Sequence, residues 1–523
     1  MSIDNVSKEI METKVNRKNS SYGFIAEIIP KLFAFLVVSL LIFAGTAPIL
    51  ATPVMADDLI VFAKGIAQIS SASNFLDLSE IFFENIRLST GYHHIMPMAG
   101  VISFLQDWSI YQLLTVLPDP LLLFAIFRTC WHIFSLVAMS LFINELLLES
   151  RFNDFRAFIT TFAFSGVGFI SFTQIHSAWK ESPIASYGIH GSGIAGIGFL
   201  YLYGIVKITG AKHFSILKTL TVLILGTVGI LTYEMFIAPL LVGIVLYVHL
   251  SRKHLTFRQI FRNRSLMVVV IPLSFFLVSQ IIRLFNSDKN YYDGTQFGDP
   301  NLIFPSFLTG MYGSLPLAYL DQAVRQVGFA RVEFEALAQF ISSLLALLVV
   351  VWVANRKKAS IGNFVNYSNS RLIIRLLIAL WVISTVSFMV AAKYQNELGV
   401  ELGRIYMFYA LGNLAIIGIS IIWLLGSTSR VQILIVSFIA TIGLYTNAYN
   451  AALVSKIQSN EMIKSYTFMF QTISDNNVPS TKKCAWQSYL RASNLPEYYK
   501  ESLIPNFNLF YYNYYGSPFC VQS

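Results

Sequence analysis

The residues best suited to acid–base chemistry in this sequence are two adjacent carboxylates, Asp57 and Asp58, which stand just beyond a long apolar run and Pro53. A carboxylate at the boundary of a low-dielectric region is costly unless it is hydrogen-bonded, paired or used. One with a raised pKa can take a proton from an attacking hydroxyl group. The same pair could instead cap a helix N-terminus, where aspartate accepts hydrogen bonds from backbone N–H groups. The spacing leaves both roles open.

Five more ionisable residues lie within or beside apolar runs. Arg128 and His132 are four residues apart and so share one face of a helix. Glu234 lies in a short turn, Arg283 near the end of one run, and Arg404 at the start of another. An arginine fork matches phosphate oxygens, so these positions suit a lipid phosphate. The alternative is snorkelling to headgroups for Arg283 and Arg404, and a buried pair for the deeper Arg128.

Polar residues between the runs add further candidates. Arg87, His93 and His94 form a cluster suited to contacting a sugar or a lipid headgroup. Lys180 lies in a later segment with aromatic and hydrogen-bonding neighbours, which suits either a sugar-binding wall or a membrane interface. Because adjacent histidines rarely ligate one metal, we expect no cofactor, with a divalent metal held by His93 and the two aspartates as the alternative.

The composition indicates which elements must position these residues. Of the 523 residues, 55% are hydrophobic and only 12% are charged. A soluble fold of this size cannot cover its surface with so few charges, so we predict an all-α, polytopic membrane protein. A bilayer core of roughly 30 Å takes about 20 helical residues. Eleven apolar runs are long enough: 31–50, 120–147, 156–175, 190–208, 214–232, 234–250, 266–285, 335–354, 372–392, 405–425 and 431–453.

The positive charge sets the predicted orientation. The net charge is +9, and more than half of the lysines and arginines fall in short loops on one side of these runs. Such loops are typical of the cytoplasmic face, so the N-terminus is expected inside and the C-terminus outside. The charge is then an orientation signal, and nucleic acid is not an expected partner. The less apolar segment 94–117 is interpreted as an interfacial or re-entrant helix on the outer face.

The predicted organisation has three parts. Residues 1–30 form a cytoplasmic tail, and residues 31–453 form the transmembrane domain. Two outer segments interrupt that domain: 51–119, with amphipathic surface helices, and 286–334, mostly loop. Residues 454–523 form an extracytoplasmic C-terminal cap. In an oxidising compartment its two cysteines, Cys484 and Cys520, are expected to form a disulfide.

A first span followed directly by Asp57-Asp58 and a long outer segment resembles the integral-membrane glycosyltransferases of the GT-C fold. The stretch Gly403-Arg404-Ile405-Tyr406 is similar to the Arg-then-Tyr pattern often found there. The resemblance implies a polyprenyl-phosphate sugar donor, a loop carboxylate as general base, and inversion at the anomeric carbon. The bacterial enzymes that decorate O-antigen with glucose are similar in size and layout.

The resemblance and the polar residues together predict the function. We expect a glycosyltransferase that moves a sugar from a polyprenyl-phosphate carrier to a glycan or lipid-linked acceptor on the outer face. The resemblance places it in a bacterial inner membrane, with its site facing the periplasm. The alternatives are an O-antigen polymerase or ligase, or a transporter or flippase of lipid-linked sugars. A transporter is disfavoured because polar groups near mid-membrane and repeat symmetry are missing from the sequence.

Overall fold

The structure is a computed structural model, and it describes a large part of the chain with gaps. The described residues are 50–54, 56–91, 96–148, 188–209, 215–252, 255–256, 259–260, 263–285, 297–315, 341, 367–400, 406–426, 454–455, 457–475, 477–493 and 497–520. In these residues the regular structure is helical, apart from one isolated bridge between Phe297 and Ala391. The predicted all-α class is therefore confirmed for this part of the chain.

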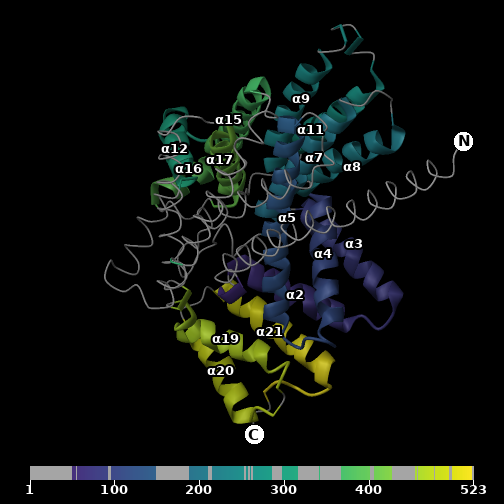
Figure 1. Ribbon diagram of the computed structural model, residues 1–523. Helices are drawn as coiled ribbons and strands as arrows, with labels where there is room; N and C mark the ends of the chain where they lie inside the picture. The colour runs from purple at the N-terminus through teal and green to yellow at the C-terminus, as the bar shows by residue number, and fades with distance from the viewer. Residues whose placement is uncertain are drawn as a thin grey trace, which may run out of the picture.

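The helices fall into three groups along the chain (Figure 1). The first group is α2 (Ala56–Ser71), α3 (Phe75–Gly91), α4 (Pro97–Leu113) and α5 (Pro120–Leu148). The second is η1 (Ile189–Gly193), α7 (Ile194–Thr209), α8 (Ile216–Thr232), η2 (Glu234–Phe236), α9 (Ile237–Ser251), η3 (Arg264–Leu266), α11 (Met267–Phe285), α12 (Pro300–Gly313), α15 (Tyr367–Met389), α16 (Ala392–Val400) and α17 (Tyr406–Gly426). The third, at the C-terminus, is α19 (Glu461–Gln471), α20 (Ser480–Ala492) and α21 (Glu497–Tyr515).

Five of the described helices are long and apolar enough to cross a membrane, which indicates a membrane protein. They are Pro120–Leu147, Ile189–Thr209, Glu234–Ser251, Arg264–Ile282 and Asn369–Met389. Two shorter apolar helices, Ile216–Thr232 and Leu411–Ser420, coincide with further expected spans. Apart from Leu50 and Ile341, the expected spans 31–50, 156–175, 335–354 and 431–453 lie outside the described residues.

Helix α5 connects the two ends of the molecule, running from the C-terminal cap into the bundle of apolar helices (Figure 1). Its start follows from sequence, because the Asp119 side chain accepts a hydrogen bond from the backbone N–H of Leu122 at 3.0 Å. Pro120, the first helical residue, has no N–H to satisfy. This cap fixes the register of the helix that carries Arg128 and His132.

Two separate hydrophobic cores lie along α5. The outer core joins α2 and the start of α5 to α19 and α21, through residues such as Phe62, Phe124 and Phe470. The membrane core joins the second half of α5, from Leu136 onward, to α7, α9, α15 and α17. Between them the buried residues of α5 are polar: Arg128, Thr129, His132 and Ser135. The polar layer therefore marks the junction of the two cores.

The first outer segment differs in one respect from the expectation. Helix α2 is amphipathic, and its apolar face is buried inside the protein against α4 and α21. Hydrophobic periodicity shows that a face is buried but not by what, because lipid and protein satisfy it equally. By contrast, α3 leaves Phe75, Leu76 and Phe83 exposed.

Of the second outer segment, 286–334, the structure describes residues 297–315, and residues 300–313 form helix α12. The reason is local. Asp299 accepts a hydrogen bond from the N–H of Asn301, and Pro300 is the first helical residue. This Asp-Pro start is the same signal that begins α5.

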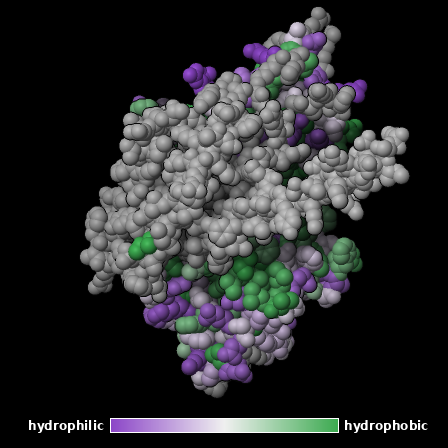
Figure 2. Space-filling model, in the orientation of Figure 1, coloured by the Kyte–Doolittle hydropathy of each residue, from purple (hydrophilic) through white to green (hydrophobic). Residues whose placement is uncertain are grey.

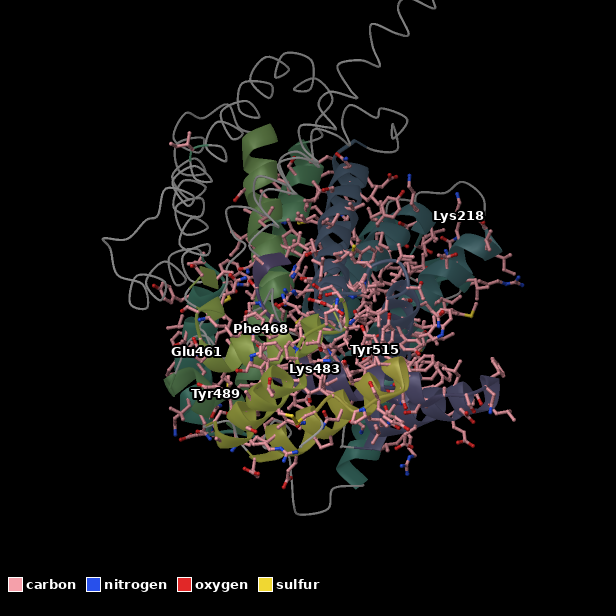
Figure 3. The ribbon with its side chains drawn as sticks, turned by 90° about the horizontal axis from the view of Figure 1, so that it is seen from below. Lys218, Glu461, Phe468, Lys483, Tyr489 and Tyr515 are labelled. Carbon is pink, nitrogen blue, oxygen red and sulfur yellow. A yellow bond between two sulfur atoms is a disulfide. The ribbon has the colours of Figure 1, made fainter. Side chains whose placement is uncertain are left out.

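The C-terminal cap is a small three-helix unit tied by the Cys484–Cys520 disulfide. Inside it, the buried ammonium of Lys483 donates a hydrogen bond to the Tyr511 hydroxyl at 2.7 Å. The same ammonium lies 5.9 Å from the ring centroid of Phe519, and Figure 3 shows Lys483 among the cap helices. A cation held by rings and a hydroxyl, next to a disulfide, gives the cap a fixed interior.

Close helix packing depends on glycines in the second group. A β-carbon at Gly196 would lie 2.5 Å from the Phe134 ring, and one at Gly198 would lie 2.6 Å from Pro239. Glycines at the start of α7 therefore allow its close packing on α5 and α9. At the far end of α7, Lys207 forms a 2.7 Å ion pair with the buried Glu145 of α5.

Candidate functional site

The site begins with Asp58, in the first turn of α2. Asp58 is partly exposed, and it interacts electrostatically with two residues from other helices, Asp107 and Arg128. The side chain of Asp57 lies outside the described residues, although its backbone belongs to α2. Of the adjacent carboxylates, Asp58 is therefore the one that can be placed among other charged groups.

Asp107 is the functional candidate that the sequence reasoning missed. It lies on α4, is only 4% exposed, and packs against α2 at Gly65. A β-carbon at residue 65 would overlap Oδ2 of Asp107, so a larger residue there would force the carboxyl group to move. Burial raises the pKa of Asp107 well above its ordinary value, and the negative charge of Asp58 raises it further. The available signal was an aspartate inside the apolar segment 94–117.

Gly65, where Asp107 packs, and Asp58 are seven residues apart in α2, so they lie on the same face of the helix. The carboxyl groups of Asp58 and Asp107 are therefore both beside that face. Seven residues span roughly 10 Å of helix axis. We use the name acidic strip for this stretch of α2, with the partly exposed Asp58 near one end and the buried carboxyl group of Asp107, from α4, beside Gly65 at the other.

Replacing Asp107 by asparagine should stabilise the protein at neutral and alkaline pH. Because the folded-state pKa is raised, the folded protein takes up a proton that the unfolded chain lacks, so stability falls as pH rises from the ordinary value through the folded pKa. Each unit of that shift is worth about 1.4 kcal/mol. Thermal unfolding in detergent, measured from pH 5 to 9, should show a declining midpoint for the parent and a flatter one for Asp107→Asn. A steeper decline in the variant would contradict this assignment.

Arg128 lies between the acidic strip and the cap. Its guanidinium is 2% exposed, and Nη2 donates a 2.7 Å hydrogen bond to the carbonyl of Thr52. It also interacts electrostatically with Asp58 and with Tyr466 of α19. This burial beside an acidic residue is compatible with the buried pair given above as the alternative for Arg128. The arginine holds the chain just before α2 and provides a positive charge beside the carboxylates.

The neighbours of Arg128 complete a polar layer. One helical turn further along α5, Nδ1 of His132 is hydrogen-bonded with the Ser192 hydroxyl of η1. Nε1 of Trp131 donates to Oε1 of Gln106 on α4 at 3.2 Å. The η1 segment is a single turn of π-helix, a local widening that often occurs at functional sites. Helices α4, α5 and η1 thus meet through polar contacts at the junction of the two cores.

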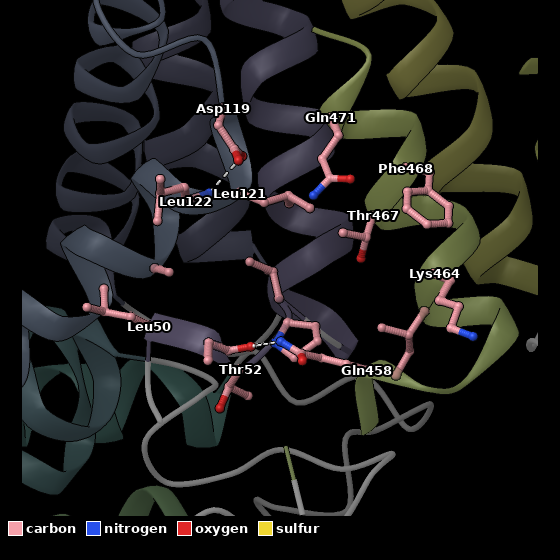
Figure 4. Close-up of a pocket in the computed structure, with 15 residues that line it drawn as sticks. Leu50, Thr52, Asp119, Leu121, Leu122, Gln458, Lys464, Thr467, Phe468 and Gln471 are labelled. Carbon is pink, nitrogen blue, oxygen red and sulfur yellow. Dashed lines mark hydrogen bonds between the residues drawn. The ribbon is translucent and has the colours of Figure 1, made fainter. Parts of the chain in front are cut away.

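The segment Leu50–Val54 also lines a cavity of about 430 Å³. Its walls are mostly apolar and come from that segment, the start of α5 and α19. In Figure 4, Thr467 and Gln471 face the cavity from α19, while the ammonium of Lys464 points away from it. The hydrophobic patch above the cap in Figure 2 lies at the same level of the molecule. The cavity and the polar layer share Thr52, whose carbonyl binds Arg128.

Glu234 lies beside an aromatic row. It follows Tyr233, whose ring packs on His190 at 5.2 Å and stacks on Phe388 at 6.4 Å. The aromatic row continues from Phe388 to Tyr394, with ring centroids 5.5 Å apart. His190 belongs to η1, the same segment whose Ser192 is hydrogen-bonded with His132.

The remaining predicted site residues divide into two sets. Arg87 is exposed on α3 and forms a two-bond ion pair with Glu84 of the same helix, at 2.7 and 2.8 Å. This pair lowers the pKa of Glu84. The side chain of Arg283 lies outside the described residues, as do His93, His94, Lys180 and Arg404. Within the described ranges, no group of three or more histidines, cysteines and acidic residues could hold a metal ion.

Comparison with known proteins gives no relative from which a role could be carried over. No protein-family model matches the chain, and no curated protein matches it significantly.

Proposed function

We propose that the chain is a membrane glycosyltransferase that moves a sugar from a polyprenyl-phosphate carrier to a hydroxyl of a glycan or lipid-linked acceptor. The observation that carries the proposal is the electrostatic interaction of Asp58 with the buried Asp107 and Arg128 at the junction of the outer and membrane cores. This junction joins a polar reaction site to an apolar environment, which a sugar attached to a lipid requires. The GT-C-like arrangement of about eleven spans, with the cap in the periplasm of a bacterium, is part of the same proposal.

The proposed reaction uses the two carboxylates differently. Asp58, partly exposed and beside the Arg128 charge, accepts the proton of the acceptor hydroxyl. The hydroxyl oxygen forms a bond to the anomeric carbon as the bond to the phosphate oxygen breaks, and the phosphate leaves with the electron pair. Asp107, with its raised pKa, retains a proton and adds no second negative charge beside the departing phosphate.

The cavity behind the segment Leu50–Val54 is where we place the apolar part of a substrate, next to the reacting groups. We expect the phosphate of a lipid bound in this cavity to lie close to the polar layer that contains Arg128. The proposed partners are accordingly the lipid-linked donor, the acceptor glycan and membrane lipids.

The test is a transfer assay with membranes that contain the chain, a labelled polyprenyl-phosphate sugar and a lipid-linked glycan. Labelled acceptor should form with inversion at the anomeric carbon, and a nucleotide sugar should give none. Membranes without the chain provide the blank. Polymerised repeat units would indicate a polymerase instead, and movement of the intact donor across the membrane without transfer would indicate a transporter.

A further inference from the structure

The segment that leads into α2 is held by the C-terminal cap, more than 400 residues later in the chain. The Val54 carbonyl accepts a 2.8 Å hydrogen bond from the hydroxyl of Tyr466, a bond that is buried. The Ala51 carbonyl accepts a 2.6 Å hydrogen bond from Nε2 of Gln458. Since buried carbonyls are costly to leave unpaired, the Tyr466 bond fixes the position of the backbone at Val54.

The third hydrogen bond to this segment comes from α5, the helix that continues into the membrane core. Thr52, between the two residues held by the cap, accepts its bond from Arg128. The backbone from residue 51 to 54 is therefore held by donors from α5 and the cap together. We call this segment the α2 leader. Asp58 follows only four residues after its last carbonyl.

The cap also holds the rest of α2. Phe62 packs on Phe470 of α19, with ring centroids 6.0 Å apart. At the far end of the helix, Nδ2 of Asn513 donates to the hydroxyls of Ser70 and Ser71 at 3.1 and 2.8 Å. Any displacement of the cap would thus move α2 and the carboxylate it carries.

We infer that Tyr466 is a positioning residue for the proposed transfer: its hydroxyl, by holding the α2 leader, places Asp58 within reach of the acceptor hydroxyl. The inference rests on the proposed function. Tyr466 acts through Val54 and needs no contact with substrate. A misplacement of about 1 Å in a reacting group can cost on the order of 10²-fold in rate, so one hydrogen bond to the leader can have a large kinetic effect.

The test is the change Tyr466→Phe, which removes the hydroxyl and keeps the ring. We expect kcat to fall at least about tenfold with KM for donor and acceptor changed less than about twofold. Hydrogen–deuterium exchange of a peptide covering residues 51–60 should rise at the same time. A matched control loses an equivalent bond elsewhere: Tyr201→Phe removes a bond to the Val268 carbonyl. It should retain parent kcat and parent exchange in that peptide.

A second variant guards against a folding defect in the first. Gln458→Met removes an exposed donor to the leader, so it should fold normally and shift exchange and kcat in the same direction by a smaller factor. Parent-like exchange in Tyr466→Phe, or raised exchange with parent kcat, overturns the inference. A kcat loss as large in Tyr201→Phe does so as well. If the parent transfers no sugar, the proposed function fails. The hold of Tyr466 on the α2 leader is then tested by exchange alone, and unchanged exchange of residues 51–60 in Tyr466→Phe refutes it.

Discussion

Replacing Asp58 by asparagine should reduce sugar transfer by about 10²- to 10⁴-fold, the range expected for losing a general base. The amide would keep the size and helix-capping ability of the side chain but could not accept the proton. Stability should change little, because Asp58 is partly exposed. The measurement is kcat/KM in the transfer assay, with expression and thermal unfolding checked in parallel.

The matched control for Asp58 is Asp77→Asn on α3, which removes a carboxylate that is also partly exposed from the same outer segment. It should retain parent activity. Asp57→Asn tests the other member of the adjacent pair in the same assay. The assigned role is refuted if Asp58→Asn keeps parent activity, or if Asp77→Asn loses as much activity as Asp58→Asn. Helix capping would then remain as the function of the pair.

Replacing Arg128 by methionine should damage both stability and transfer. Removing one partner of a buried charged group typically costs about 3–5 kcal/mol. Here the Thr52 carbonyl would lose its donor and Asp58 its neighbouring cation. We expect a clearly lower unfolding midpoint in detergent and at least a hundredfold lower kcat/KM.

The design for Arg128 needs both a control and a coupled variant. Arg375→Met removes an exposed arginine from the long apolar helix α15 and should leave stability close to that of the parent. Because Asp58 and Arg128 interact, the double variant Asp58→Asn/Arg128→Met should be less destabilised than the two single effects combined. Strict additivity would show that the two charges do not interact in the folded protein.

Part of the fold and of the site could be predicted from the sequence alone. The apolar composition predicted the all-α class, since so few charges cannot surround a soluble protein of this length. The four-residue spacing of Arg128 and His132 correctly placed them on one helix face, because helical geometry depends only on local sequence. Asp58 was recognised from its position beyond an apolar run, again a local signal.

Other residues of the site could not be identified in this way. Asp107 lies in the less apolar segment 94–117, and nothing in its local sequence indicates that it packs on Gly65. Arg87, a candidate by residue type, is an exposed partner of Glu84. The apolar face of α2 was assigned to a membrane surface, while the structure buries it against the cap.

Taken by itself, the sequence determined the helical membrane class and the residues able to carry charge near its boundaries. Both depend on hydropathy and on spacing within a helix, which are properties of neighbouring residues. Only the tertiary structure decided which of those charges meet. Asp58 meets Asp107 from α4 and Arg128 from α5, and the leader to α2 meets Tyr466 from the far end of the chain. Such contacts follow from how separate helices pack, and no local period encodes which surfaces will be partners.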